Sequence, residues 1–331
     1  WRQVTPRFSV IVLNYNGRAW LEPCLGALTT QSGAPSFEVL LVDNGSSDGS
    51  VGFAASRFPS LRIVDNERNL GFAAGNNAAA RAARGEILVF LNNDTVPASD
   101  WLARLNFAML DLPGRALVTS RLVFLDRPET IDSAGDGYLR AGGAFKRGHG
   151  ADAAAYAASC EVFGACGAAF AIERQLFERL GGFDDDFFMV YEDVDLSYRA
   201  RLAGHTCWYA ADAVVRHAGS ATLGTMSSAA VFHGQRNLEW TFIKNTPRRL
   251  LWRTLPLHLL YSAAGVFHYI ARGQGLAALK GKAAALAGLP RVLAKRRAVQ
   301  DACRVDRAAI ERQLTRGWIA VKRAEKDRSR L

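Results

Sequence analysis

Acidic and amide side chains directly follow two apolar runs near the start of the chain. The run EILVFL at 86–91 is followed by Asn92-Asn93-Asp94, and EVLLV at 38–42 is followed by Asp43-Asn44-Gly45-Ser46. A carboxylate held at the end of a buried strand can bind Mg²⁺ or Mn²⁺, and such an ion stabilises a departing diphosphate. Asp94 is therefore a candidate metal ligand, although an Asp at this place can also begin a turn or cap a helix.

Asp43 offers hydrogen-bonding chemistry. An acceptor at the carboxyl end of a strand suits the imide N–H of uracil or thymine, but DNGSSDG at 43–49 is equally typical of an ordinary turn. No GxGxxG follows the first apolar run and no GxxxxGK(S/T) occurs, which disfavours a dinucleotide-binding or P-loop protein.

A third group consists of Glu192-Asp193 with Asp195, and of His217 further along. Adjacent acids at a helix start can simply stabilise the helix dipole, or they can supply a general base that deprotonates an acceptor hydroxyl. A lone His is more often structural than a ligand, but His217 follows a strand-like run and precedes a Gly/Ser loop. Together with Asp94, these residues could form a metal site with an adjacent base.

The elements that must position these residues are strands alternating with helices. Apolar runs at 8–13, 38–42, 61–64 and 86–91 predict strands. Helical segments are predicted at about 20–28 and 73–84, and later at 173–180 and 191–202. Continuous apolar strands between helices indicate an α/β fold with a mostly parallel central sheet flanked by helices. Ligands of such sheets bind outside the carboxyl ends of the strands, where the polar residues lie.

The chain changes character after Asn245. Residues 254–271 carry no formal charge but are borderline in length for a span, which needs about 20 residues, so we expect a segment on the membrane surface or a re-entrant one. Gly288-Leu289-Pro290 should break the helices, and 291–331 predicts a charged helix. The predicted units are a catalytic domain at 1–245 and a helical, basic, membrane-associated region at 246–331.

Charge is distributed unevenly. From Lys244 onward, 20 Lys and Arg residues oppose 5 Asp and Glu, a balance of +15, whereas the preceding residues carry −5. A basic segment can bind nucleic acid or an anionic membrane surface, or be a solvated helical face. Because no aromatic RNA-binding motif accompanies it, nucleic acid is disfavoured. Five cysteines without a CxxC pair and a start without a signal-peptide pattern predict a cytoplasmic protein. The basic C-terminal region adds the prediction that it is peripheral on the inner face of the cell membrane.

Five motifs, in this order, resemble the inverting glycosyltransferases of family 2, which have the GT-A fold. The matching pieces are VIVLNYNG, EVLLVDNGSSDGS, NERNLGFAAGNNAAARAARGEILVFLNNDT, GGFDDDFFMVYEDVDLSYRARLAGH and VVRHAGSAT. The resemblance spans about 8–246, and among members of the family the sequence is most similar to bacterial rhamnosyltransferase-type enzymes.

The resemblance implies a role for each matching residue. Asp94 would be the main carboxylate ligand of Mg²⁺ or Mn²⁺, because the usual DxD motif is Asn92-Asn93-Asp94 here, and His217 would complete the coordination. Asp193 would be the base and Glu192 would orient it. Gly164–Gly167 would line the acceptor side. The donor nucleotide would be bound by Asn14, Asn16, Asp43, Arg68, Asn69, Asn77, Asn92 and Asn93.

The resemblance also implies the reaction and its partners. A hexosyl group would move from a nucleotide-diphospho-sugar, with dTDP-rhamnose favoured over a UDP-sugar, to a saccharide or polyprenyl-linked saccharide in cell-envelope polysaccharide synthesis. A single displacement inverts the anomeric configuration. A nucleotide-binding protein without transferase activity is the alternative, and it would follow if the amide-rich Asn92-Asn93-Asp94 failed to hold a metal.

Overall fold

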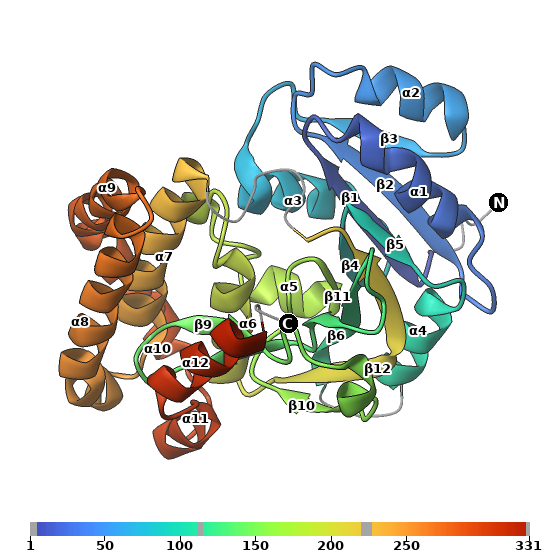
Figure 1. The fold of residues 1–331 in the computed structure, drawn as a ribbon. Coiled ribbons are helices and arrows are strands. Elements are labelled where there is room, and N and C mark those ends of the chain that lie inside the picture. The colour runs from blue at the N-terminus through green and yellow to red at the C-terminus, as the bar shows by residue number, and fades with distance from the viewer. Residues whose placement is uncertain (1–4, 111–114, 220–226, 329–331) are drawn as a thin grey trace.

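The computed structural model describes residues 5–110, 115–219 and 227–328. Its centre is a mixed sheet in the order β10-β12-β6-β11-β4-β1-β2-β3 (Figure 1). One apolar cluster on each face of this sheet buries the strand side chains against helices. The predicted α/β class with a mostly parallel central sheet is confirmed.

The first half of the sheet is the predicted parallel unit. Strands β1 (Phe8–Asn14), β2 (Phe37–Asp43), β3 (Arg62–Asp65) and β4 (Ile87–Asn92) alternate with helices α1 (Arg18–Thr29), α2 (Ser50–Arg57) and α3 (Gly71–Ala82). All four strands run in the same direction. Their register pairs Asn14 with Asp43, Asp43 with Asp65, and Leu13 with Asn92. The polar residues that follow β1, β2 and β4 therefore lie at one edge.

The second half of the sheet is mixed. Strand β11 (Ala169–Glu173) is antiparallel to β4 and to β6 (Arg115–Phe124), while β12 (Thr206–His217) is parallel to β6. Short strands β5 (Thr95–Pro97), β7 (Ile131–Ser133) and β10 (Cys160–Val162) extend this half, and β8 (Asp136–Tyr138) with β9 (Ala144–Lys146) forms a separate hairpin. Helices α4 (Trp101–Leu110), α5 (Arg174–Arg179) and α6 (Glu192–Leu202) and 3₁₀ turns Ala153–Tyr156 and Asp185–Phe187 complete this part.

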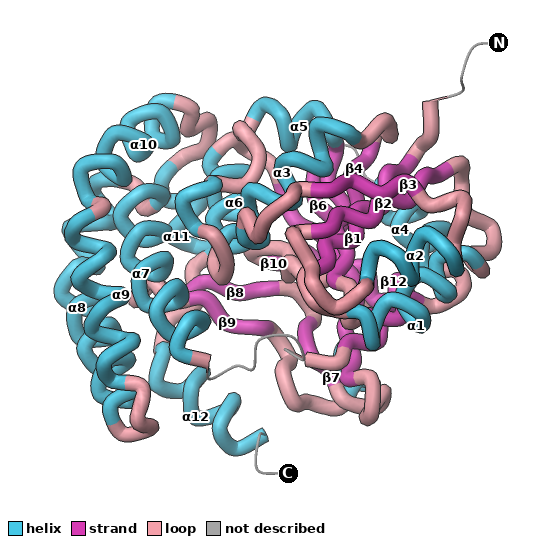
Figure 2. Tube along the Cα trace, turned by 90° about the horizontal axis from the view of Figure 1, so that it is seen from above, coloured by secondary structure: helices cyan, strands magenta, loops and turns pink. Residues whose placement is uncertain are grey.

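A group of helices lies beside the sheet. These helices are α7 (Ser228–Asn245), α8 (Arg248–Ile270), α9 (Gly275–Ala287), α10 (Leu289–Asp301), α11 (Arg307–Gln313) and α12 (Trp318–Arg328). Figure 2 shows α8, α9 and α10 at the side of the molecule remote from the sheet. Helix α7 packs against α6 as well as α9 and α10, so it joins the two parts. The predicted boundary at 245/246 falls in the turn between α7 and α8 and stays a prediction. No helix among the described ranges is long and apolar enough to cross a membrane.

The single charged helix predicted at 291–331 is wrong. Three shorter helices occupy the described part of it, because contacts with distant segments interrupt it in two places. The backbone N–H of Arg304 donates to the carbonyl of Leu202, and Thr315 exchanges backbone hydrogen bonds with the β8–β9 hairpin through Tyr138 and Arg140. Such long-range backbone pairing is invisible to helical periodicity.

Candidate active site

Three predicted donor-site residues form one hydrogen-bonded group at the carboxyl edge of the sheet. The Nδ2 atom of Asn14 donates to Oδ1 of Asp43 at 3.0 Å and lies 3.1 Å from Oγ of Ser46. Asn93 donates to Oδ1 of Asn14 at 2.8 Å. The backbone N–H of Ser46 donates to the second oxygen of Asp43 at 2.8 Å. The side chains after β1, β2 and β4 are thus held in fixed orientations, while each Asp43 oxygen keeps a free lone pair.

Tight packing of the following loops supports this group. An added Cβ at Gly17 would lie 2.0 Å from Nδ2 of Asn93, so only glycine allows the backbone before α1 to pack against this side chain. Asn16 has a φ of 49° and accepts a hydrogen bond from the backbone N–H of Ser47 at 2.8 Å. The loops after β1 and β2 are therefore joined through Asn16.

Arg68 and Asn69 lie beside the loop that follows β2, as predicted donor-site residues should. Asn69 accepts from the Gly71 backbone at 2.8 Å and from Nδ2 of Asn44 at 3.2 Å. The backbone of Arg68 lies against Gly45, where an added Cβ would come within 2.7 Å of it. Their contacts with a donor nucleotide stay predictions.

Asn77 has a different set of partners. Its Nδ2 donates to the Phe183 carbonyl at 2.8 Å and to Oδ1 of Asp185 at 2.6 Å, and its Oδ1 accepts from the Phe183 backbone at 3.0 Å. Both ends of the amide thus hold the loop that leads toward α6. Its predicted contact with the donor remains untested.

Asp94 and His217 meet where β5 pairs with the end of β12. Nε2 of His217 lies 3.3 Å from Oδ1 of Asp94, and both side chains are buried. On the other side of the ring, Nδ1 donates to Oδ2 of Asp132 at 2.7 Å. A histidine that ligates a metal through one nitrogen usually donates its other ring N–H to a carboxylate, as His217 does to Asp132.

The charges around His217 balance each other. Burial lowers the pKa of a histidine, but here hydrogen bonds with Asp132 and the nearby charge of Asp94 outweigh burial and raise the pKa of His217 to about 9. Burial also acts against ionisation of Asp132, yet hydrogen bonds from His149 and His217 and the charge of Lys146 hold its pKa well below the usual range. Lys146 donates to both Asp132 oxygens, at 2.8 and 3.0 Å.

This arrangement fits a divalent cation. Nε2 of His217 is buried and forms an ion pair with Asp94. Because the pKa of His217 is raised to about 9, this nitrogen carries a proton near neutral pH, and a bound cation would replace that proton. The separation of 3.3 Å between Nε2 and Oδ1 of Asp94 is close to the spacing of about 3 Å between neighbouring ligands of an octahedral ion with bonds of about 2.1 Å. Asn93 turns its amide toward Asn14, which leaves Asp94 as the carboxylate of this motif.

The segment that delivers Glu192 and Asp193 is strained. Phe188, Val190 and Tyr191 have φ values of 63°, 67° and 77°, which non-glycine residues rarely adopt. Asn237 on α7 lies against this segment, with Nδ2 within 2.9 Å of the carbonyls of Phe187 and Met189 and 2.7 Å of that of Val190. Strain of this kind clusters at functional sites because the surrounding structure must hold it.

Asp193 has the geometry expected of a base. Its Oδ2 accepts from the Gly167 backbone at 2.7 Å, and its Oδ1 accepts from the Val194 backbone at 2.7 Å. Burial raises its pKa despite these hydrogen bonds. Asp193 is partly exposed, whereas Glu192 is buried. Asp195 is fully buried and bound by Arg199, Lys244 and Asn245, which makes it part of the core.

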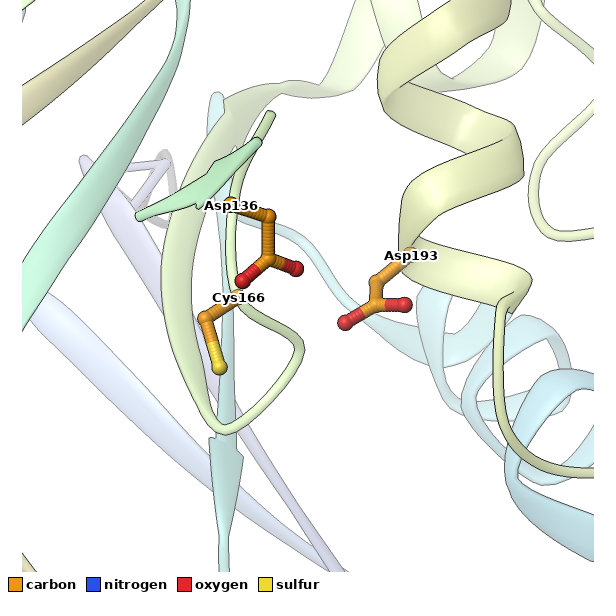
Figure 3. Close-up of side chains that lie close together, drawn as sticks. All are labelled: Asp136, Cys166 and Asp193. Atoms are coloured by element: carbon orange, nitrogen blue, oxygen red, sulfur yellow. The ribbon is translucent and has the colours of Figure 1, made fainter. Parts of the chain in front are cut away.

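Asp132, Asp136, Lys146 and Asn237 are site residues that the sequence analysis missed. The first three lie within 131–146, where short strands and glycines leave no clear periodicity, and Asn237 lies on a helix distant in sequence. Asp136 on β8 turns a carboxyl oxygen toward Asp193, and Cys166 lies beside Asp136 on the loop before β11 (Figure 3). The one signal available for Asp132 and Asp136 was two acids within an otherwise apolar and glycine-rich stretch.

The sequence profile of glycosyl transferase family 2 matches residues 9–181, which is more than half of the chain. The chain belongs to glycosyltransferase family 2. The match includes the group at the carboxyl edge and Asp94 but ends before Glu192 and His217. The last three residues of the VVRHAGSAT motif, 220–222, lie outside the described residues.

Relatives of this family 2 glycosyltransferase support the fold and the class of enzyme. It is similar to the mannosyltransferase PcManGT from Pyrobaculum calidifontis, solved in complex with GDP-Man and Mn²⁺, with 25% identity, a TM-score of 0.54, and 90% and 86% of the two chains covered. It is 28% identical to the N-acetylglucosaminyl-diphospho-decaprenol L-rhamnosyltransferase of Mycobacterium tuberculosis over 77% of this chain and 89% of that protein. The fold is therefore GT-A.

Some relatives are much longer than this glycosyltransferase. It is 28% identical to the uncharacterized protein y4gI of Sinorhizobium fredii over 66% of this chain but only 25% of that protein. The chain spans about a quarter to a third of the length of this protein and of two further curated relatives.

Proposed function

We propose that this glycosyltransferase is an inverting, metal-dependent hexosyltransferase of cell-envelope polysaccharide synthesis. The observation that carries the proposal is the buried Asp94–His217–Asp132 arrangement, with Nε2 of His217 facing Asp94 at 3.3 Å. A divalent cation, Mg²⁺ or Mn²⁺, bound there would neutralise the diphosphate of the donor as it departs. The solved mannosyltransferase with GDP-Man and Mn²⁺ supports a nucleotide-sugar and metal in this fold.

The donor nucleotide would bind along the carboxyl edge of the first four strands. Asp43 is held by Asn14 and the Ser46 backbone, so it can accept a hydrogen bond from a pyrimidine imide without reorganising. Asn16, Arg68 and Asn69 border the same loops. We favour dTDP-rhamnose as the donor, in line with the similarity to a rhamnosyltransferase, and a UDP-sugar is the alternative.

Asp193 would remove the proton from the acceptor hydroxyl. The Gly167 N–H and the start of α6 fix its carboxylate, and its raised pKa makes it a better proton acceptor than an ordinary Asp. As it loses its proton, the acceptor's hydroxyl oxygen attacks the anomeric carbon on the side opposite the departing nucleotide diphosphate. This single displacement inverts the anomeric configuration. Glu192 is buried, lies next to Asp193 in the sequence and would orient Asp193.

The C-terminal helices would hold the enzyme on an anionic membrane at its cytoplasmic face. Ten of the fifteen large apolar side chains that are exposed among the described residues lie on α8, α9 and α10. On α9 they are Leu276, Leu279 and Leu286, which share one face, while Ala278, Gly281 and Ala285 face the protein. Residues 246–300 contain basic residues but no Asp or Glu. Apolar stripes with only basic neighbours are typical of helices that lie in a lipid interface, where a polyprenyl-linked saccharide acceptor is found.

Flotation with vesicles of phosphatidylcholine and phosphatidylglycerol tests the membrane contact. The triple substitution Leu276→Ser, Leu279→Ser and Leu286→Ser should abolish flotation. Phe107→Ser is the matched control, since Phe107 is 65% exposed on α4, away from these helices. Flotation that survives the triple substitution would contradict the proposed surface.

A panel of nucleotide-sugars tests the transfer activity and the donor. We expect dTDP-rhamnose to be hydrolysed slowly, or transferred to an octyl glycoside, only when Mn²⁺ or Mg²⁺ is present. The product released by a single displacement should have the opposite anomeric configuration, which NMR detects. Calorimetric binding of dTDP or UDP without turnover of any sugar would instead favour a nucleotide-binding protein without transferase activity.

A further inference from the structure

Asp136 faces the proposed base across a small gap. Ligand atoms of Asp136, Cys166 and Asp193 all lie within 4.8 Å of one another, and the three side chains converge from different elements (Figure 3). Asp136 is only 7% exposed, and its Oδ1 has no hydrogen-bond partner among the described residues. The gap therefore contains an unpartnered carboxyl oxygen beside the atom that would take the acceptor proton.

The backbone fixes the direction of the Asp136 side chain. Asp136 and Gly164 exchange backbone hydrogen bonds of 2.9 and 3.0 Å, which join β8 to the loop that carries Cys166 and Gly167. Gly167 in turn binds Asp193, and an added Cβ at Gly167 would lie 2.9 Å from Oδ2 of Asp193. Asp136 and Asp193 are therefore held opposite one another by the same loop.

The Asp136 carboxyl group is in a place where burial is costly. A buried carboxyl group without a full set of hydrogen bonds costs free energy, and a second acid opposite it adds to the cost. Lys146, whose charge acts on Asp136, donates its hydrogen bonds to Asp132. A group kept in such a place is expected to have a partner when substrate is bound.

The size of the gap matches hydrogen bonds to hydroxyl groups. The three atoms lie within 4.8 Å of one another, so a point between them lies no more than about 2.8 Å from each, within the reach of a hydrogen bond. A metal ion in the gap would occupy the lone pairs of Asp193 that must accept the proton. Sugars instead offer pairs of neighbouring hydroxyl groups, each of which can donate to one carboxylate.

We propose that Asp136 is a specificity residue of the acceptor site, which binds the hydroxyl adjacent to the attacking one. The acceptor must then present a vicinal diol, with one hydroxyl donating to Asp193 and its neighbour to Asp136. This inference rests on the proposed function, in which Asp193 is the base. It names the part of the acceptor that this site recognises, whatever the rest of the acceptor is.

Donor hydrolysis and sugar transfer by the same enzyme distinguish a residue that binds the acceptor from one that acts on the donor. Hydrolysis of the nucleotide-sugar uses water, which has no neighbouring hydroxyl, whereas transfer to an octyl glycoside needs the diol. Asp136→Asn should raise the KM for the octyl glycoside about 10-fold, as expected for one lost hydrogen bond, and should therefore reduce transfer more than metal-dependent hydrolysis. Glu161→Gln is the matched control, because it removes a carboxylate on β10 whose partner is Arg201.

Deoxy glycosides complete the test. In wild type, the deoxy glycoside that lacks the hydroxyl next to the attacking one should have a KM raised by a similar factor. In Asp136→Ala, the KM for this deoxy glycoside should be no higher than the KM for the complete glycoside. If the increases in KM caused by the substitution and by the missing hydroxyl multiply, the assignment is overturned. Equal losses of hydrolysis and transfer in Asp136→Asn would also overturn it. A lower melting temperature of Asp136→Asn than of wild type would also overturn it, since it would show a structural role. Absence of both reactions in wild type would count against the proposed function and not against this inference.

Discussion

Asn237 on α7 should control both stability and catalysis through the strained segment at 188–191. Its Nδ2 lies 2.7 to 2.9 Å from the backbone carbonyls of Met189 and Val190 in this segment and of Phe187 just before it. Each of the two N–H groups of the amide contributes about 0.5–1.5 kcal/mol net, and Asn237→Ala also leaves carbonyls buried without a partner. We therefore expect Asn237→Ala to lower the free energy of unfolding by about 2–3 kcal/mol. Because the segment sets the start of α6, the position of Asp193 should change as well.

Chemical denaturation and the rate of metal-dependent donor hydrolysis measure the two effects. Asn237→Ala should lower the free energy of unfolding by this amount and reduce kcat by at least an order of magnitude, consistent with the sensitivity of catalysis to displacements of about 1 Å. Asn106→Ala is the matched control, because Asn106 is a half-buried helix residue of α4 that accepts one bond from Arg7. We expect it to change stability by less than about 0.5 kcal/mol.

A second substitution tests the strain itself. Val190 has a φ of 67°, which costs a residue with a side chain about 1–2 kcal/mol and costs glycine nothing. Val190→Gly introduced into Asn237→Ala should therefore recover part of the lost rate. The reasoning is refuted if Asn237→Ala retains full stability and rate, or if Val190→Gly alone is as damaging as Asn237→Ala.

Three further outcomes follow from single contacts. Asp193→Asn should reduce transfer by about 10²- to 10⁴-fold while calorimetry shows unchanged dTDP or UDP binding, and full transfer activity would exclude Asp193 as base. Gly17→Ala should weaken nucleotide binding measured in the same way, because its Cβ displaces Asn93; unchanged affinity would contradict this packing. Burial would raise the pKa of Glu239, but His258 and Lys282 lower it from 4.5 to about 2. The ionised Glu239 carboxylate therefore stabilises the fold above pH 4.5, and this stabilisation is lost as pH falls towards 2. Melting curves of Glu239→Gln should depend less on pH in that window, and an equal slope would contradict the assignment.

Local patterns were enough to predict the strands that carry Asn14, Asp43 and Asp94. Each follows a continuous apolar run, and parallel pairing brings such ends to one edge whatever the loops do. Residue types alone suggested that Asp94 and His217 could share a metal site, and family resemblance supported it, but no local pattern shows their pairing, because β5 and β12 are about 120 residues apart in the sequence.

The remaining site residues depend on contacts that no local pattern contains. Asp132 and Asp136 lie on three-residue strands, which are too short to show a period. Asn237 reads as an ordinary polar residue of a helix, and its function becomes visible only when α7 packs against the segment before α6. The breaks near Arg304 and Thr315 have the same origin, since their partners are Leu202 and the β8–β9 hairpin.

The central claim is metal-dependent sugar transfer at the Asp94–His217 pair, and a Mn²⁺ titration of transfer activity tests it most directly. Wild type stripped of metal should be inactive and regain activity with added Mn²⁺. Asp94→Ala should lose nearly all metal-dependent activity at every concentration, because Asp94 is the carboxylate that faces Nε2 of His217. Activity of Asp94→Ala within a few-fold of wild type, with an unchanged Mn²⁺ dependence, would contradict the account and place the metal elsewhere.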